Sequence, residues 1–394
     1  MLLLLSCVLK KYNKNFWLIS WSMLFFMTSF NLIIPELNDF ITKLGAPDKK
    51  GLIITLFTIS AAISRPFSGR IADLVGRKLA MYIGIVICII VAITYPLAHS
   101  VFFFLCLRFF HGFSAGFLPT GATALVTDII PADSRGHAMA IFGTFISLGI
   151  GVGQSLGSYI YMHSNYNVLF LSSGILAILS FALMINVKET LKDRIPFSSS
   201  VFKVKKSDII EAGVLPAGFV MILTASCSGI IFVVTPDISN YLGISNKGWF
   251  FGMYILSTIF IRLFTGSLSD KIGRRQTLII GCSILFLSML LIGQSKSVEM
   301  YTASALLFGV ATGISSPTLF AWTADLSPEH RRGIGAGTIF IALELGIMMG
   351  SFSTMVFYES TFNSVSTAFT YGAVVSAIAV LYLVFHLFTQ ESKY

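Results

Sequence analysis

The sequence predicts an all-α membrane protein whose twelve transmembrane helices form two related halves of six helices each. Three observations support this prediction. The composition is strongly apolar, the apolar residues gather into twelve long runs, and the second half of the chain repeats the first. Together they exclude a water-soluble fold.

The composition is typical of a protein that spans a lipid bilayer. Hydrophobic residues occupy 55% of the 394 positions and charged residues 11%, whereas soluble domains contain about 45–50% apolar and ~25% charged residues. Because lipid offers no partners to backbone polar groups, each crossing requires a helix of about 20 apolar residues. Suitable runs lie near 16–37, 51–71, 79–98, 101–126, 137–161, 167–187, 214–238, 248–268, 276–294, 299–323, 333–357 and 366–388.

The distribution of Lys and Arg predicts the orientation. An even number of helices places both termini on one side, and the loops and tails of that side hold most of the basic residues. The opposite side carries only Lys43, Lys49, Lys50, Lys247 and Lys296. Because cytoplasmic loops are enriched in Lys and Arg, we expect both termini in the cytoplasm and the protein in the inner membrane. This asymmetry accounts for the net charge of +9, so nucleic-acid binding is not expected.

The second half of the chain repeats the first at one offset. Residues 65–78 (RPFSGRIADLVGRK) recur 197 positions later as residues 262–275 (RLFTGSLSDKIGRR). Residues 34–37 (IPEL) match residues 235–238 (TPDI) with a small shift. Internal repeats of this kind are typical of secondary transporters.

The repeat predicts the domain boundaries. We expect a six-helix half at residues 1–187, a cytoplasmic linker at 188–213 and a second six-helix half at 214–394. The linker is basic and polar, which is typical of a solvated tether on the cytoplasmic side.

Several short motifs resemble those of the major facilitator superfamily of transporters. Residues 69–78 (GRIADLVGRK) and their repeat at 266–275 resemble its loop signature. Residues 108–112 (RFFHG) and 188–191 (KETL) are similar to elements of its proton-coupled drug and metabolite exporters. Those exporters usually have Gly-x-x-x-Gly-Pro in helix 5, where residues 149–154 read GIGVGQ. The resemblance implies the major facilitator fold and proton-coupled transport of a small molecule by alternating access, without enzyme activity.

The loop signatures are expected to form an inner gate at the cytoplasmic side. Asp73 can pair with Arg77 across the turn, and Asp128 can share that arginine. Gly69 can let a neighbouring helix approach, and Gly76 can permit a tight turn. The resemblance implies that this network latches the outward-facing state. The predicted members in both halves are Gly69, Asp73, Gly76, Arg77, Asp128, Gly266, Asp270, Gly273, Arg274 and Asp325.

The repeat also separates scaffold residues from candidates for transport chemistry. Polar residues present in both halves are expected to belong to the moving scaffold. Arg65 and Arg262 correspond to each other, so we expect them to reach the cytoplasmic interface or to join the inner gate. Arg108 and His111 correspond to apolar residues of the second half. Polar residues present in one half alone are candidates for substrate or proton handling.

Glu344, Arg108 and His111 are the candidates for proton coupling. Glu344 lies about eleven residues into helix 11, ~15 Å deep in a core of ~30 Å, and corresponds to Ser147. Burial favours the protonated form of a carboxylate, as a proton-exchange site requires. A structural carboxyl group, hydrogen-bonded or paired with an arginine such as Arg108, is the alternative. An ionisable residue inside the bilayer usually faces a cavity or an internal partner.

The superfamily's architecture implies a central cavity lined by helices 1, 4, 7 and 10. The polar residues that these helices offer, besides His111, are Asn31, Arg108, Thr224, Ser228, Thr312 and Ser316. The leading prediction is a proton-coupled exporter of a small organic compound of the amphipathic, drug-like kind. The alternatives are an importer, symporter or facilitator for a sugar, organic acid or siderophore, and a membrane-embedded enzyme or sensor.

Motifs for enzymatic chemistry are absent from the sequence: it contains no phosphate-binding Gly-x-x-x-x-Gly-Lys loop, no His-Glu-x-x-His pair and no nucleophile elbow. We therefore expect no metal and no cofactor. The expected partners are a small-molecule substrate, protons and the lipid bilayer, and the expected state is a monomer.

Overall fold

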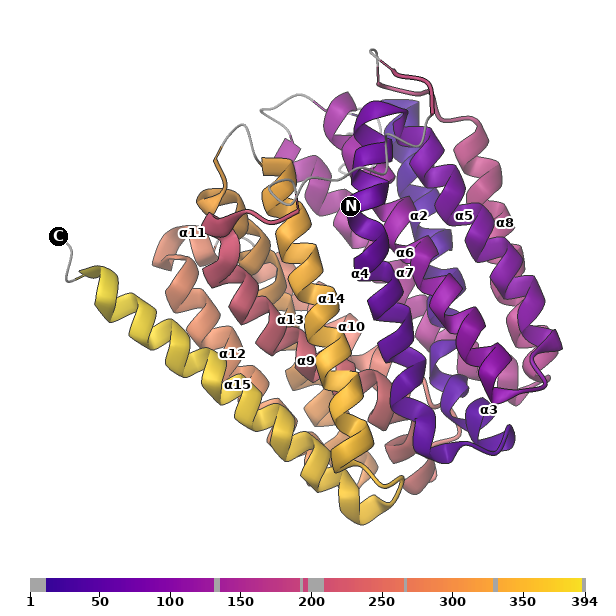
Figure 1. Ribbon diagram of the computed structural model, residues 1–394. Coiled ribbons are helices and arrows are strands. Elements are labelled where there is room, and N and C mark those ends of the chain that lie inside the picture. Colours follow the sequence, from indigo (N-terminus) through magenta and orange to yellow (C-terminus); the bar gives the residue numbers. More distant parts are fainter. Residues whose placement is uncertain are drawn as a thin grey trace, which may run out of the picture.

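The computed structural model describes residues 12–130, 135–191, 194–197, 209–265, 268–328 and 332–391, and long helices run side by side through them (Figure 1). The first half contains α2 (Lys14–Leu32), α3 (Leu37–Lys43), α4 (Lys50–Leu74), α5 (Arg77–Thr94), α6 (Val101–Ile129), α7 (Arg135–Met162) and α8 (Tyr166–Ile185). The second half contains α9 (Leu215–Tyr241), α10 (Trp249–Thr265), α11 (Leu268–Ile272), α12 (Arg274–Gly293), α13 (Val298–Leu326), α14 (Arg332–Phe357) and α15 (Phe362–Glu391).

The predicted all-α membrane architecture is confirmed. Within the described residues, eleven helical segments are long and apolar enough to cross a membrane. The twelfth predicted crossing corresponds to α10, whose apolar stretch Trp249–Arg262 is shorter. Helix α10 ends at Thr265, just before residues 266–267, which lie outside the described part of the chain.

Successive long helices run in opposite directions, so their connections alternate between two faces. The connections at residues 75–76 and 273 share one face with residues 186–191 and 209–211, and we call it the linker face. The opposite face, which we call the far face, carries connections such as 44–49, 242–248 and 358–361. In Figure 1 the far face is at the bottom, where α3 lies.

Three large apolar clusters hold the helices together. One lies within the first half and includes Phe16 and Met184, and one lies within the second half and includes Val214 and Leu383. The largest combines residues of both halves near the far face, such as Leu37 of α3 with Ile238 of α9, Phe250 of α10 and Tyr358. The halves are therefore joined by a buried apolar core at the far face.

Glycines at matched positions let the halves approach closely there. A Cβ atom at Gly51 of α4 would lie 2.6 Å from the backbone oxygen of Ser351 in α14. A Cβ atom at Gly248, the repeat equivalent of Gly51, would collide with the backbone oxygen of Gln154 in α7. The contacts of α4 with α14 and of α10 with α7 are thus two copies of one interface. Gln154, which stands where exporters usually have proline, contributes its backbone to the second copy.

Candidate functional site

Two buried ion pairs join the halves at the far face. Lys50 Nζ lies 2.6 Å from Asp237 Oδ2, and both side chains are at most 11% exposed. Lys247 Nζ lies 2.7 Å from Glu36 Oε2, and these side chains are at most 8% exposed. Each pair crosses from one half to the other, and the lysines correspond to each other at the repeat offset. We call these two pairs the far-face gate.

The gate carboxylate of the second half is saturated with hydrogen-bond donors. Tyr358 Oη donates to Asp237 Oδ2 at 2.7 Å, and Asn38 Nδ2 lies 3.3 Å from Asp237 Oδ1. Asn38 also donates to the backbone oxygen of Val233 at 2.6 Å. A buried charge is costly unless it is paired and hydrogen-bonded, so these donors favour the gate's closed arrangement.

The second pair has similar support. Ser158 Oγ donates to Glu36 Oε1 at 2.8 Å, and Lys247 Nζ lies 2.6 Å from Asp39 Oδ2 as well. Burial disfavours the charged form of Lys247, but Glu36 and Asp39 outweigh it and raise the lysine's pKa. Lys247 therefore stays protonated at neutral pH, which is what a persistent ion pair requires.

At the linker face, Arg77 is the centre of an ionic network. Its guanidinium pairs with Asp73 one turn earlier, and its Nε lies 3.2 Å from Asp128 Oδ2. Thr190 Oγ1 donates to the same Asp128 oxygen at 2.7 Å. The two contacts of Arg77 are those that the sequence predicts, whereas the contact of Thr190 was not predicted. All of them lie within the first half and the start of the linker.

Glu189 completes this network as the N-terminal cap of α5, a role that the KETL motif did not reveal. Its carboxylate accepts from the backbone N–H groups of Arg77 at 3.2 Å and Lys78 at 2.9 Å. Burial alone would raise the pKa of Glu189, but backbone donors from α5 and from residues 190 and 191 lower it. A Cβ atom at Gly76 would lie 2.8 Å from Glu189 Oε2, so a larger residue there would have to displace this carboxylate.

The second copy of the signature is partly described. Arg274 Nε lies 2.9 Å from Asp325 Oδ2, and Arg274 Nη1 donates to Ser269 Oγ at 2.7 Å. Gly273 has a φ of +91°, which favours glycine at this turn. Gly266 and the side chain of Asp270 lie outside the described residues.

The close helix approach expected at Gly69 is not present. A Cβ atom at this position would meet nothing within 4 Å. The reason is that the closest contacts of α4 with α14 lie toward the far face, around Gly51. Gly69 therefore has free space around it in this arrangement of the halves.

Two arginines, Arg65 of α4 and Arg262 in the last turn of α10, contact the other half. Arg65 Nη2 of α4 lies 2.8 Å from Glu344 Oε1 of α14. Arg262 Nη1 of α10 donates to Ser147 Oγ of α7 at 2.9 Å. The expectation that these arginines lie at the cytoplasmic interface or in the inner gate is therefore wrong. Glu344 is paired with an arginine, as one alternative proposed, but its partner is Arg65 and not Arg108.

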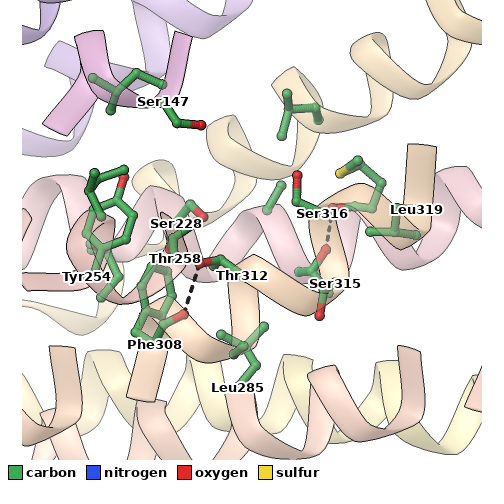
Figure 2. Close-up of a pocket in the computed structure, with 18 of the residues that line it drawn as sticks. Ser147, Ser228, Tyr254, Thr258, Leu285, Phe308, Thr312, Ser315, Ser316 and Leu319 are labelled. Atoms are coloured by element: carbon green, nitrogen blue, oxygen red, sulfur yellow. Dashed lines mark hydrogen bonds between the residues drawn. The ribbon is translucent and has the colours of Figure 1, made fainter. Parts of the chain in front are cut away.

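A cavity of about 190 Å³ lies mainly among helices of the second half. Four of the predicted cavity residues line it, namely Thr224, Ser228, Thr312 and Ser316. Figure 2 shows Ser147 of the first half on one side and Ser228, Thr258 and Thr312 on the other. Much of the remaining lining is apolar or aromatic and includes Phe232, Tyr254, Phe308 and Phe320, together with Arg262.

Arg108 and His111 do not line this cavity but form a buried cluster in the first half. Arg108 donates from Nε to the backbone oxygen of Ile53 at 3.2 Å and from Nη1 to Tyr95 Oη at 3.3 Å. Its guanidinium also stacks on the ring of Phe57, 4.7 Å from the centroid. His111 Nδ1 is hydrogen-bonded with the same Tyr95 hydroxyl at 3.1 Å.

Asn31 is also placed away from the cavity. Gln154 Nε2 donates to Asn31 Oδ1 at 3.1 Å, and Asn31 Nδ2 donates to the backbone oxygen of Met27 at 2.8 Å. The glutamine at the usual proline position thus ties α7 to α2 inside the first half.

The far-face gate is what residue-by-residue inspection of the sequence missed. Lys50 and Lys247 obey the repeat offset, and Glu36 and Asp237 follow the two matched prolines. The expectation that polar residues present in both halves belong to the moving scaffold also applies to these four residues, so the repeat contained the signal for this gate.

Comparison with known proteins agrees with this architecture. The family model described as Major Facilitator Superfamily matches residues 16–216 and again residues 214–394. The multi-drug resistance efflux pump PmrA homolog of Lactococcus lactis subsp. lactis (strain IL1403) is 26% identical over 348 residues, which cover 84% of each chain.

Two solved structures are similar in fold. The human organic anion transporter MFSD10 (TETRAN) superposes with a TM-score of 0.72 at 18% identity, covering 94% of this chain and 99% of its own. A D-xylose-proton symporter superposes with a TM-score of 0.75 at 15% identity, covering 94% and 96%. The family model covers both halves, so the chain belongs to the Major Facilitator Superfamily and is a multi-pass membrane transporter.

Proposed function

We propose that this transporter exports a small organic compound in exchange for protons by alternating access. The curated relative that is named as a multidrug efflux pump supports export, as does the resemblance of residues 108–112 and 188–191 to exporter motifs. The observation that carries the proposal is the Arg65–Glu344 ion pair, because it places a titratable carboxylate between the two halves that must move.

In this proposal the linker face is cytoplasmic and the far face lies outside, an orientation that the distribution of Lys and Arg supports. With the far-face gate closed, the arrangement described above is closed to the outside. The inner-gate residues around Arg77 pair within the first half here, and Gly69 has no close neighbour. In our proposal they pack against the second half only after the halves rock to the outward-facing state.

A proton has a direct mechanical consequence at Glu344. As a carboxylate, Glu344 holds Arg65 across the contact of α4 with α14 at 2.8 Å. Protonation removes the negative charge, so the attraction between opposite charges is lost. A hydrogen bond from the Arg65 guanidinium to a neutral carboxyl group remains, which is weaker than the ion pair. The tie between the halves then loosens, so proton binding and rocking are coupled. Arg65 remains on the ring of Phe340, 4.5 Å from the centroid.

The test is transport by purified protein in liposomes with an imposed pH gradient. Glu344→Gln should abolish uphill accumulation while ligand exchange without a gradient persists. Glu359→Gln, which neutralises an exposed carboxylate on the far face, is the control and should retain uphill transport. If Glu344→Gln drives uphill transport as well as wild type between about pH 6 and 8, Glu344 is not the proton carrier. Proton flux in the same direction as substrate would replace antiport with symport.

A further inference from the structure

The two arginines that contact the other half occupy equivalent places but have different partners. Arg65 and Arg262 are matched by the repeat, and each reaches across to the other half. Arg65 meets the carboxylate of Glu344, whereas the partner of Arg262 among the described residues is the hydroxyl of Ser147, at 2.9 Å. Ser147 is the repeat equivalent of Glu344. The fold thus contains the same contact twice, once with a carboxylate and once with a hydroxyl group.

Arg262 lies on the wall of the cavity together with Ser147. No carboxylate lies within ion-pair distance of Arg262 in the part of the chain that the structure describes, and its Nε has no hydrogen-bond partner there. A cation in a low-dielectric site favours binding of an anion, because an unpaired buried charge is costly. The guanidinium fork suits a carboxylate, which can accept two parallel hydrogen bonds.

The rest of the lining describes the body of such a ligand. Tyr254, Phe308 and Phe320 contribute aromatic rings, and Thr224 and Thr312 add hydroxyl groups with no net charge. Aromatic side chains bury a flat apolar body well. The cavity therefore combines one positive charge with an aromatic wall.

We infer that the cavity binds an aromatic organic anion, whose carboxylate is held by Arg262 and Ser147. This inference rests on the proposed function in one respect: if the protein is a transporter of organic compounds, the inference names the class of compound that it transports. Arg65 does not serve this purpose, because Glu344 already neutralises it.

The test uses the purified full-length protein and three probes of nearly equal size: 2-naphthoate, 2-naphthamide and 2-naphthylmethylamine. Affinities are measured by calorimetry at neutral pH without any proton gradient. We expect wild type to bind the carboxylate at least about tenfold more tightly than the neutral amide, as charge-assisted hydrogen bonds imply, and the amine most weakly.

Two variants remove the free charge in different ways. Arg262→Gln deletes it, and Ser147→Glu supplies the carboxylate that Glu344 supplies to Arg65, so both should erase the preference for 2-naphthoate. Arg262→Lys should keep part of it, because the charge remains without the planar fork. The melting temperature of each variant, measured in parallel, identifies any that fails to fold.

The inference is overturned if wild type binds none of the probes, prefers the amine, or binds the acid and the amide equally. It is also overturned if a folded Arg262→Gln protein keeps the preference. Because binding is measured at equilibrium, these results are independent of proton coupling. A preserved preference with no proton-driven transport would count against the proposed function and leave this inference standing.

Discussion

The far-face gate predicts how the resting conformation responds to loss of charge. The perturbation is Glu36→Gln together with Asp237→Asn, which removes one partner from each inter-half pair. In the closed state Lys50 would then be buried without the Asp237 charge, and Lys247 would keep Asp39 but lose Glu36. In the open state both lysines would be hydrated, so the substitutions destabilise the closed state alone.

The expected size of the effect follows from burial. Removing one partner of a buried pair costs about 3–5 kcal/mol. We take ~3 kcal/mol for each substitution because the new amides can still accept hydrogen bonds and because Lys247 keeps its pair with Asp39. Reversing a two-state population from 99:1 to 1:99 takes about 5.5 kcal/mol. For a wild-type protein that is about 99% closed, a single substitution should give a mixture, whereas the double variant should be mainly open.

The assay is the distance between spin labels at Asp48→Cys and Glu359→Cys, in a variant without other reactive cysteines. Both positions are exposed on the far face, in different halves. Wild type should show one short distance, each single variant two distances, and the double variant mainly the longer one. If the double variant gives the wild-type distance, the ion pairs do not hold the gate closed.

Three further predictions concern the linker face. Asp73→Asn or Arg77→Ala should abolish transport in liposomes without preventing membrane insertion. Asp270→Asn should have a milder effect on transport. Wild-type turnover in Asp73→Asn would show that the Asp73–Arg77 network does not latch the outward-facing state. Glu189→Gln should destabilise the protein by about 1 kcal/mol, the usual value of a helix cap, seen as a lower melting temperature. Because the folded-state pKa of Glu189 is lowered, its stabilisation is present above the unfolded value and is lost as pH falls through the folded one, so the two melting curves should converge in acid.

Local features of the fold could be predicted from the sequence. The apolar runs predict the helices, because lipid requires about 20 such residues for each crossing. The pairing of Arg77 with Asp73 and Asp128 could also be predicted. Asp73 and Arg77 lie on either side of one short turn, and Asp128 lies at the end of α6 on the same face. The repeat predicts which contacts occur twice.

Contacts between the halves could not be predicted in the same way. Arg65 and Glu344 are far apart in the sequence, and their contact depends on how α4 packs against α14. The position of the cavity, mainly in the second half, likewise depends on how the helices pack. Arg108 and His111, which the RFFHG motif suggested as transport residues, lie instead beside Tyr95 and Phe57 in the first half. The depth of a side chain in the membrane can be estimated from the sequence of its own helix, but its contact partner depends on how two helices pack.

The gate and the coupling site should respond differently to pH. Lys247 has a raised folded-state pKa, so its stabilising contribution is complete below the unfolded value of about 10.4. That contribution is lost only as pH rises through the still higher folded value. Lys247 should therefore keep its charge between about pH 6 and 8, so it should not change the conformation in that range. If Glu344 is the proton carrier that we propose, the far-face distances in the spin-label assay should depend on pH in wild type and be constant in Glu344→Gln. A Glu344→Gln protein that still changes its distances with pH would show that another group controls the conformation.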